Sequence, residues 1–246
     1  MDSVAGRLWL AGATAIAEAP DADRVELIAG FGSRDAAGDA AAAIGGKVVD
    51  VGSEDWLDAW RAHARVVRAG RVVVVPAWID APATSPDDVV IRIDPGRVFG
   101  HGGHPTTRLI LEQLDRRVTG GETVLDVGCG SGVLGIAAAR LGARRVVAID
   151  VDPDAVTVTK ENAVRNGVEV EASTTPIADL AGTFDLVLAN IGADVLKELA
   201  TNLERLGPVL LLSGLLVDRV DDVVAAYAGT ATASTLEGWA ALSITA

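Results

Sequence analysis

The stretch that most constrains the fold runs from Val124 to Asp150 and reads VLDVGCGSGVLGIAAARLGARRVVAID. A short apolar run leads into a glycine-dense turn, a helix of small residues follows, and a second apolar run ends in a carboxylate. This order predicts a βαβ unit, in which a helix connects two parallel strands. Parallel strands are buried on both faces, so the chain must supply further strands and covering helices.

The turn of this unit is typical of a nucleotide site. Glycines at positions 128, 130 and 132 allow the backbone to approach a ligand and to adopt positive φ. Asp150, at the tip of the second strand, can accept hydrogen bonds from both hydroxyls of a ribose. The alternative is that the glycines only make a tight turn, but the joint occurrence of turn and tip acid favours a nucleotide.

The acid at Asp126 discriminates between nucleotides. Gly130, Gly132 and Gly135 match the dinucleotide fingerprint GxGxxG, which is weak evidence alone. Asp126 precedes Gly128 by two residues, where a pyrophosphate would approach, and an acid there is unfavourable for NAD. S-adenosylmethionine carries a positive sulfonium and a positive ammonium. We therefore expect S-adenosylmethionine, with an NAD-dependent oxidoreductase as the weaker alternative.

Composition narrows the class further. The 246 residues suit one large domain, or one domain with a small appendage. No apolar run reaches the ~18–20 residues of a membrane helix, and no signal peptide is recognisable, so we expect a cytoplasmic protein. The single cysteine, Cys129, excludes an internal disulfide, and its place in the turn favours a packed small residue over a nucleophile. The net charge of −13 argues against nucleic-acid binding and suits a basic protein partner or a cationic cofactor.

The first 52 residues are expected to form a small α+β domain with a thin core. Its predicted elements are strands over 8–19, 24–31 and 47–51, and a helix that ends near Ala43. Residues 53–67 are expected to form a linker helix. Trp56 and Trp60 lie on one face of that helix, as a packing stripe or, alternatively, a partner surface.

The segment 94–107, DPGRVFGHGGHPTT, contains more glycines than a simple connection between two elements needs. It leads into a helix that begins at Pro105, so it can close over a ligand. His101 and His104 have the spacing H-x-x-H, but only Asp94 offers a further metal ligand nearby. We therefore expect no metal, and histidines that shape the loop or face the substrate.

Strands and helices alternate through the rest of the chain and predict a doubly wound parallel sheet closed by an antiparallel hairpin. Ligands bind such sheets at the carboxyl ends of the strands, where Gly128, Asp150 and Asn190 lie. The predicted strands are 71–78, 89–93, 123–127, 145–149, 168–172, 184–191, 209–216, 230–236 and 239–244. The predicted helices are 105–118, 131–141, 153–166, 193–206 and 218–227.

Several motifs together resemble one family. The turn DVGCGSG and the acid in IDVDP resemble class I S-adenosylmethionine-dependent methyltransferases, which have a Rossmann-like sheet. The loop DPGRVFGHGGHPTTRLILEQL, with DWLDAW, RVVVVPAWID, VLANI and LLSGLL, resembles more specifically the PrmA family, methyltransferases of the eleventh protein of the large ribosomal subunit. The resemblance extends from about Asp55 to the C-terminus.

This resemblance implies roles for individual residues. Thr107 would hydrogen-bond the cofactor, the backbone of Gly128 would contact its methionine end, and Asp150 would bind its ribose. Asn190 would lie beside the target amine. Apart from the resemblance, the Asn190 carbonyl could orient the amine, and His104 is a candidate base that ranks below solvent water. The full set expected to bind the cofactor is Thr107, Asp126, Gly128, Gly130, Gly132, Asp150 and Asn190.

The resemblance also implies the reaction and the partner. The family methylates lysine side chains and an N-terminal amine, often to the trimethyl state. The expected substrate is the stalk-base protein of the large ribosomal subunit, with no direct nucleic-acid or membrane contact, and the enzyme is expected to be a monomer. Residues 68–246 would be the methyltransferase domain and residues 1–52 the substrate-recognition domain. Methylation of another protein or a small molecule, and a non-catalytic cofactor-binding module, are the alternatives.

Three departures from the family pattern are visible. The family loop usually reads FGTGTHPTT, whereas this chain has His101 and Gly103 in place of two threonines. The motif after the fourth strand of the methyltransferase sheet usually reads NILAGPL, whereas this chain has NIGADVL. The N-terminal piece is also shorter than the family's ferredoxin-like βαββαβ domain.

Overall fold

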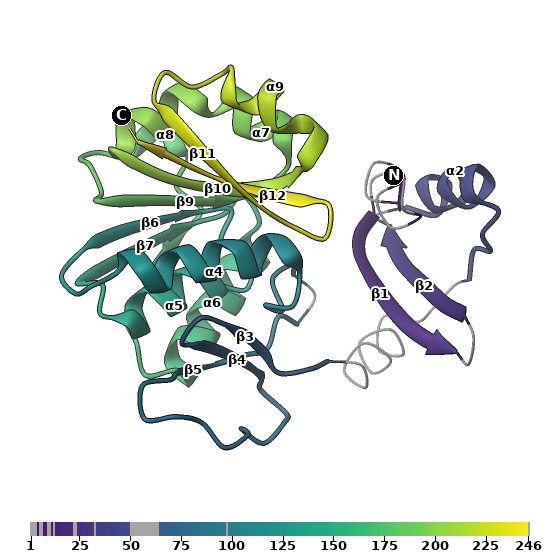
Figure 1. Cartoon of the computed structure of the whole chain (residues 1–246), viewed down its shortest axis with the longest axis horizontal. Helices are drawn as coiled ribbons and strands as arrows, with labels where there is room; N and C mark the ends of the chain where they lie inside the picture. Colours follow the sequence, from purple (N-terminus) through teal and green to yellow (C-terminus); the bar gives the residue numbers. More distant parts are fainter. Residues whose placement is uncertain are drawn as a thin grey trace. The chain divides into compact units, whose positions relative to one another are not determined.

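The computed structural model describes residues 4, 7, 8, 11, 13–21, 24–31, 33–49, 64–96 and 98–245, without the side chains of residues 14–26. The chain divides into two compact units, Met1–Ala64 and Arg65–Ala246 (Figure 1). Each unit is described by itself below. The assignment of residues 1–52 to substrate recognition stays a prediction.

The first unit contains an antiparallel pair of strands, β1 (Ala13–Asp21) and β2 (Arg24–Phe31), and the helix α2 (Arg34–Ile44). The helix begins where the Ser33 hydroxyl accepts a hydrogen bond from the Ala36 amide at 3.2 Å. It ends at Gly45, whose φ of 73° is favourable only for glycine. The core is small, with Leu8, Ala13 and Ala40 as its buried members and Leu27, Ala29, Phe31 and Ile44 packed against them.

Three predictions for this region are wrong where the structure tests them. Leu8 is helical and Ala11 lies in a turn, so the predicted strand 8–19 begins only at Ala13. Residues 47–49 have no regular structure, and Val49 is 61% exposed, so this segment lacks the burial and the pairing of a strand. Residues 64–66 are also irregular and Val67 begins a strand, so the predicted linker helix does not extend to residue 67. Trp56 and Trp60 lie outside the described residues.

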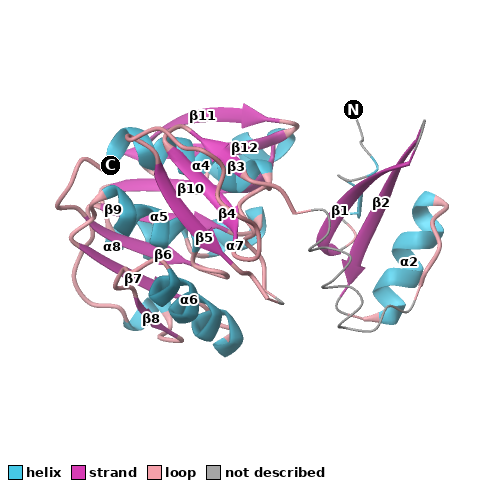
Figure 2. Cartoon of the chain, turned by 90° about the horizontal axis from the view of Figure 1, so that it is seen from below, coloured by secondary structure: helices cyan, strands magenta, loops and turns pink. Residues whose placement is uncertain are grey.

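Seven strands of the second unit form the main sheet, in the spatial order β11–β12–β10–β9–β6–β7–β8 (Figure 2). Strands β10, β9, β6, β7 and β8 are parallel, and β12 runs antiparallel to both β10 and β11. The doubly wound sheet with a closing hairpin is therefore confirmed. In chain order the strands are β6 (Thr123–Val127), β7 (Arg145–Ile149), β8 (Glu171–Ser173), β9 (Leu186–Asn190), β10 (Val209–Leu216), β11 (Thr230–Leu236) and β12 (Trp239–Thr245).

The sheet carries helices on both faces because its strand residues alternate between two apolar cores. Along β6, Val124 packs in the core that includes α4 and α5, and Leu125 and Val127 pack in the core that includes α7 and α8. The helices are α4 (Pro105–Arg117), α5 (Val133–Leu141), α6 (Pro153–Arg165), α7 (Ala193–Glu198), α8 (Ala200–Leu206) and α9 (Val220–Val224). Two 3₁₀ turns are η1 (Ile177–Asp179) and η2 (Val217–Arg219).

Element boundaries differ most from the prediction in three places, besides shifts of one or two residues at other ends. The predicted helix 193–206 is two helices that meet at Leu199, and the predicted helix 218–227 consists of η2 followed by α9. The predicted strand 168–172 is the three-residue β8, Glu171–Ser173. Its shift follows from pairing, because Ala172 must lie opposite Ala148 of β7.

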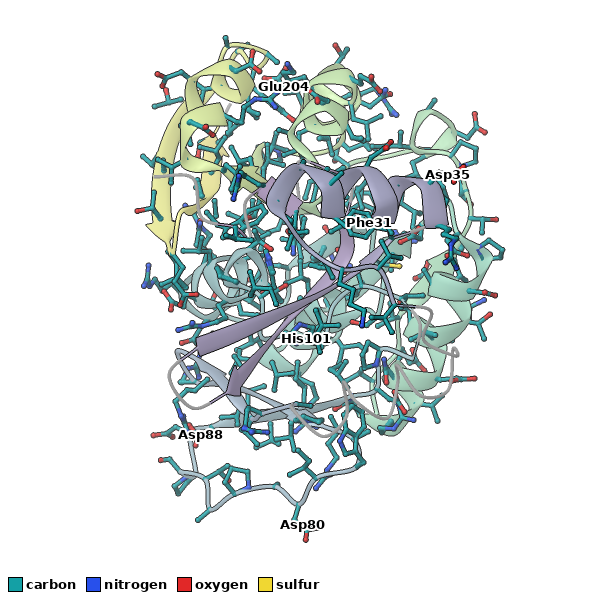
Figure 3. The ribbon with its side chains drawn as sticks, turned by 90° about the vertical axis from the view of Figure 1, so that its right-hand side faces the viewer. Phe31, Asp35, Asp80, Asp88, His101 and Glu204 are labelled. Carbon is teal, nitrogen blue, oxygen red and sulfur yellow. The ribbon has the colours of Figure 1, made fainter. Side chains whose placement is uncertain are left out.

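A second, three-stranded sheet packs beside α4 and α5. It contains β3 (Val67–Ala69), β4 (Val72–Pro76) and β5 (Val89–Ile93), with β3 antiparallel and β5 parallel to β4. Between β4 and β5 lies a proline-containing connection whose residues 80–87 are exposed, and Asp80 is marked on it in Figure 3. The glycine-rich segment 94–104 follows β5, so this sheet sets where that segment starts.

Asn162 of α6 and its C-cap residue Asn166 hold the backbone at the end of β5 and just after it. The Asn166 amide donates to the Arg92 carbonyl oxygen and accepts from the Arg92 amide nitrogen, each at 2.7 Å. Asn162 pairs in the same way with the backbone of Asp94, at 2.9 and 3.0 Å, and also donates to the Ser131 carbonyl oxygen at 2.9 Å. Asn162 is fully buried. One side chain thus joins the glycine-rich segment to the turn after β6.

We predict that Asn162→Ala lowers the free energy of unfolding by ~2–4 kcal/mol, because two carbonyl oxygens and one amide nitrogen lose their buried partner. Urea denaturation followed by circular dichroism measures the change. The exposed neighbour Glu161 provides the control, and Glu161→Ala should change stability by less than about 0.5 kcal/mol. Equal effects of the two substitutions would contradict the role of Asn162.

Candidate functional site

The glycine turn between β6 and α5 lies at the carboxyl edge of the main sheet. Gly128, Gly130 and Gly132 have φ of 72°, 52° and 79°, so all three adopt the conformation that the sequence predicts for them. The amides of Gly128 and Cys129 both donate to the Ile149 carbonyl oxygen, at 2.8 and 3.1 Å. The turn is therefore held against the end of β7. This is the position where strand order reverses in the sheet, at which doubly wound folds bind ligands.

Asp150 follows β7 directly and faces this turn. One carboxylate oxygen accepts from the Gly130 amide at 2.9 Å, and the other accepts from the Asp152 amide at 3.0 Å. A carboxylate has about four acceptor directions, so two remain for a ligand. The bonds fix the orientation of the carboxylate, and Asp150 is only half-buried. It is therefore a pre-oriented acceptor beside the glycine turn.

The glycine-rich segment 94–104 meets the same turn through its backbone. The Ser131 amide donates to the Phe99 carbonyl oxygen at 2.9 Å, and the Ser131 hydroxyl donates to the Gly100 carbonyl oxygen at 2.5 Å. A Cβ atom on Gly130 would lie 2.5 Å from the Phe99 oxygen, and one on Gly100 would lie 2.6 Å from the Ser131 hydroxyl. Glycine is required at both positions because the two backbones approach so closely.

Thr107 and Asn190 bring a second pair of elements together. The Asn190 side-chain amide, at the end of β9, donates to the Thr107 hydroxyl in the first turn of α4 at 3.2 Å. Thr107 is fully buried and Asn190 is half-buried. Next to Asn190, the Ile191 side chain covers Gly128, on which a Cβ atom would lie 2.5 Å from Ile191 Cγ2. The structure thus places Thr107, Gly128 and Asn190 around one corner of the sheet edge.

The two histidines shape the segment that precedes α4. His104 caps the helix, with its Nδ1 2.7 Å from the Thr106 hydroxyl, and its ring meets Phe99 and Trp239 edge-on. His101, marked in Figure 3, accepts from the Gly103 amide at 3.2 Å. Burial and then the nearby His101 lower the pKa of His104 to about 4, and burial lowers the pKa of His101. Both rings are therefore neutral at pH 7.

Asp126 lies beneath the turn and not in front of it. Strand alternation places its side chain on the α5 face, where it accepts from the Gly135 amide at 2.9 Å, and it is 1% exposed. Burial, together with the charge of Asp150, raises the pKa of Asp126 to about 7, against the opposing effect of the Gly135 bond. The first turn of α5 thus has an acid as an internal cap, which gives Asp126 a structural reason besides the cationic ligand inferred from sequence.

Residues that sequence reasoning missed complete this region. Ser131, Thr159 and Asn162 are fully buried polar residues, and the Thr159 hydroxyl donates to the Gly130 carbonyl oxygen at 3.0 Å. For Asn162, the clue available in the sequence was its spacing from Asn166, which places both side chains on one face of a helix. Cys129 is buried, and burial raises its pKa to about 12, which fits a packed residue and not a nucleophile.

Within the residues that the structure describes, no three His, Cys, Asp or Glu side chains gather in the arrangement of a metal site. No helix in the described part of the chain has the length and apolarity that crossing a membrane requires.

The order of strands and the site at their carboxyl edge are those of the Rossmann-like class I methyltransferase fold. A crystal structure of a ribosomal protein L11 methylase from Lactobacillus delbrueckii subsp. bulgaricus has the same fold, with a TM-score of 0.67 and 34% sequence identity. The similarity covers 73% of this chain and 96% of that one.

Sequence comparison identifies the family within that class. The family model for ribosomal protein L11 methyltransferase (PrmA) matches residues 20–246. Proteins of that name from Geobacter metallireducens and Pelobacter propionicus are 48% and 49% identical over 187 and 189 residues. The chain belongs to the PrmA family. These matches cover 74% and 72% of this chain, and they span 62% and 61% of the length of the two relatives.

The buried acid gives a prediction about pH. The carboxyl pKa of Asp126 rises from 3.8 to about 7 on folding, so its favourable contribution is complete below about pH 4 and is lost as pH rises through 7. Asp126→Asn keeps an acceptor for Gly135 without the ionisation. We expect the variant to gain stability relative to the natural protein by a few kcal/mol between about pH 4 and pH 8. Urea denaturation across this range measures the difference, and parallel pH profiles would contradict it.

Proposed function

We propose that this protein is an S-adenosylmethionine-dependent N-methyltransferase that acts on amino groups of a large-subunit ribosomal protein, lysine side chains and an N-terminal amine among them. One observation carries the proposal: Asp150, the glycine turn and the loop–helix junction at Thr107 converge at the strand-order reversal of a class I methyltransferase sheet. Membership of the PrmA family and the names of its relatives support the choice of acceptor.

The proposed cofactor contacts follow from this arrangement. Asp150 has acceptor directions left for the ribose hydroxyls after its bonds to the Gly130 and Asp152 amides. Gly128, Gly130 and Gly132 pack against Ile191, Phe99 and Thr159, so backbone atoms of the turn, and not side chains of these residues, would border the cofactor. Thr107 would meet the cofactor from the start of α4. Asp126, buried below the turn, would favour the positive groups of the cofactor through space and not by contact, and only when it is ionised, above its pKa of about 7.

S-adenosylmethionine supplies an activated methyl group, so the residues of the chain mainly have to align an amine with it, and alignment is worth ~7–11 kcal/mol in the best cases. Asn190 would orient the amine through its side-chain oxygen, since its amide nitrogen already donates to Thr107. A lysine amine has an ordinary pKa near ~10.4 and must first lose a proton. His104 is a weak base, with a pKa of about 4, so we assign the proton to water and keep His104 as a residue that orients.

The proposed partner fits the charge of the chain. With a net charge of −13, the protein attracts a basic ribosomal protein and repels nucleic acid. We propose that the first unit takes part in substrate recognition, that the enzyme acts as a monomer, and that the reaction takes place in the cytoplasm. Radiolabelled methyl transfer to purified ribosomal large-subunit proteins, compared with a panel of small-molecule amines and with a cell extract, tests this assignment.

The expected result is label on one ribosomal protein, located on amino groups by mass spectrometry. Label on another protein or on a small amine would overturn the choice of acceptor. Cofactor binding without label in any fraction would identify a non-catalytic binding module. Binding of NADH in place of S-adenosylmethionine would overturn the methyltransferase assignment as a whole.

The ribose contact gives a direct binding prediction. Asp150→Asn should weaken S-adenosylmethionine binding at least about tenfold, because a charge-assisted hydrogen bond contributes ~1.5–3 kcal/mol. Isothermal titration calorimetry measures the affinity. Asp152→Asn is the matched control, because the Asp152 side chain caps the neighbouring helix α6. This substitution should leave the affinity within about twofold. Unchanged affinity of the Asp150 variant would show that this acid does not bind the ribose.

A further inference from the structure

Four exposed or partly exposed charged residues link α7 to the segment that follows β10. Arg219 donates to Asp194 at 2.8 Å and to Asp222 at 3.0 Å, and Lys197 contacts Asp222 at 2.8 Å and Asp194 at 3.3 Å. Each cation therefore has two carboxylate partners, and each carboxylate has two cationic partners. Asp194 and Lys197 belong to α7, whereas Arg219 ends η2 and Asp222 belongs to α9. We call these four residues the α7 ion network.

The helix held by this network begins just after the acceptor side of the site. Only Ile191 and Gly192 separate Asn190, at the end of β9, from the first residue of α7. Gly192 is the N-cap and provides no side-chain hydrogen bond. A six-residue helix is too short to be stable alone, so its position depends on contacts with its surroundings. Its other end is anchored by the Tyr227 hydroxyl, which donates to the Leu196 carbonyl oxygen at 2.7 Å.

The turn between β9 and α7 touches both the glycine turn and β10. The Ile191 amide donates to the Ser213 carbonyl oxygen at 3.1 Å, and the Ile191 side chain covers Gly128. Gly214, at a bulge in β10 with φ of 96°, lets the two backbones approach, because a Cβ there would lie 2.2 Å from the Ile191 oxygen. A shift of α7 would therefore move Ile191 against Gly128 and Asn190 against Thr107.

We infer that the α7 ion network is a positioning device for the turn Asn190–Gly192, and that Asp194 is the member of the network closest to this turn in sequence. This inference rests on the proposed function and adds residues that lie outside the cofactor and acceptor contacts. Individual exposed ion pairs are weak, but a network spreads the cost of ordering each side chain over two contacts. Salt screens charges at this degree of exposure, so the effect of the network should fade as ionic strength rises.

The sequence also offers a substitute for the network. The family motif NILAGPL has glycine and proline where this chain has Asp194 and Val195. Val195 is the third residue of α7, where the backbone amide has no partner within the helix and proline is tolerated. The proline ring restricts the first turn by covalent geometry and not by charge. Asp194→Gly with Val195→Pro is therefore a rescue variant that is independent of salt.

The first measurement is methyl-transfer turnover with saturating cofactor and acceptor. At about 0.05 M salt, Asp194→Ala should lower kcat about three- to tenfold and leave cofactor affinity within about twofold. The ratio of natural to variant kcat should approach one at about 0.5 M salt. The rescue variant should recover kcat at low salt. Equal kcat for the natural protein and Asp194→Ala at low salt, or a ratio that does not change with salt, would overturn the inference.

A matched control separates positioning from the general loss of an ion pair. Arg145 and Glu171 form an exposed pair at 2.7 Å, where β7 and β8 begin, at the opposite edge of the sheet from Asn190. Glu171→Ala should leave kcat unchanged at every salt concentration. A fall in kcat comparable with that of Asp194→Ala would overturn the inference.

A second measurement does not depend on activity. Hydrogen–deuterium exchange of the peptide that contains residues 191–199 should become about tenfold faster in Asp194→Ala, and it should remain unchanged in Glu171→Ala. Unchanged exchange in Asp194→Ala overturns the positioning role, even when the natural enzyme transfers methyl groups. Faster exchange in a protein that transfers no methyl group to any acceptor supports the positioning role and overturns the proposed function instead.

Discussion

The site depends on the close approach of two backbone segments. The carbonyl oxygen of Phe99 meets the amide of Ser131 across Gly130, and the carbonyl oxygen of Gly100 meets the hydroxyl of the same serine. These contacts bring a segment that follows the three-stranded sheet onto the turn of the seven-stranded sheet. The Asn162 side chain joins the same two segments, because it donates to the carbonyl oxygens of Asp94 and Ser131. A side chain at Gly130 would separate the two segments, because its Cβ would lie 2.5 Å from the Phe99 oxygen.

Helix α4 connects this junction to the rest of the second unit. His104 caps the helix beside Phe99, Thr107 reaches Asn190 at the end of β9, and Arg117, in the last turn, donates to Ser243 of β12. The helix therefore connects the glycine-rich segment, the parallel strands and the closing hairpin.

The parts that were predictable from the sequence have short-range causes. Glycines at 128, 130 and 132 adopt positive φ, and Asp152 and Pro153 start a helix. Apolar runs alternate with helices, so the sheet and the edge at which it binds ligands could be predicted. The parts that were not predictable depend on distant partners. Asn162 has a role only because β5 lies beside α6, Asp126 points into α5, and residues 47–49 pair with no strand of the described chain. The assignment of Asp150 and Asn190 to ligand contacts remains a prediction.

The two edges of the main sheet carry different kinds of residue contacts. The carboxyl edge holds the glycine turn, Asp150 and Asn190, whereas the amino edge is joined by polar contacts such as Arg145 with Glu171 and Asp185 with the Thr123 amide, at 2.7 Å. Because substitutions at separate sites with no shared partners have largely independent effects, mutations near residues 123, 145 and 185 are expected to alter thermal stability with little effect on the carboxyl edge. Substitutions intended to raise thermal stability are therefore best placed at the amino edge.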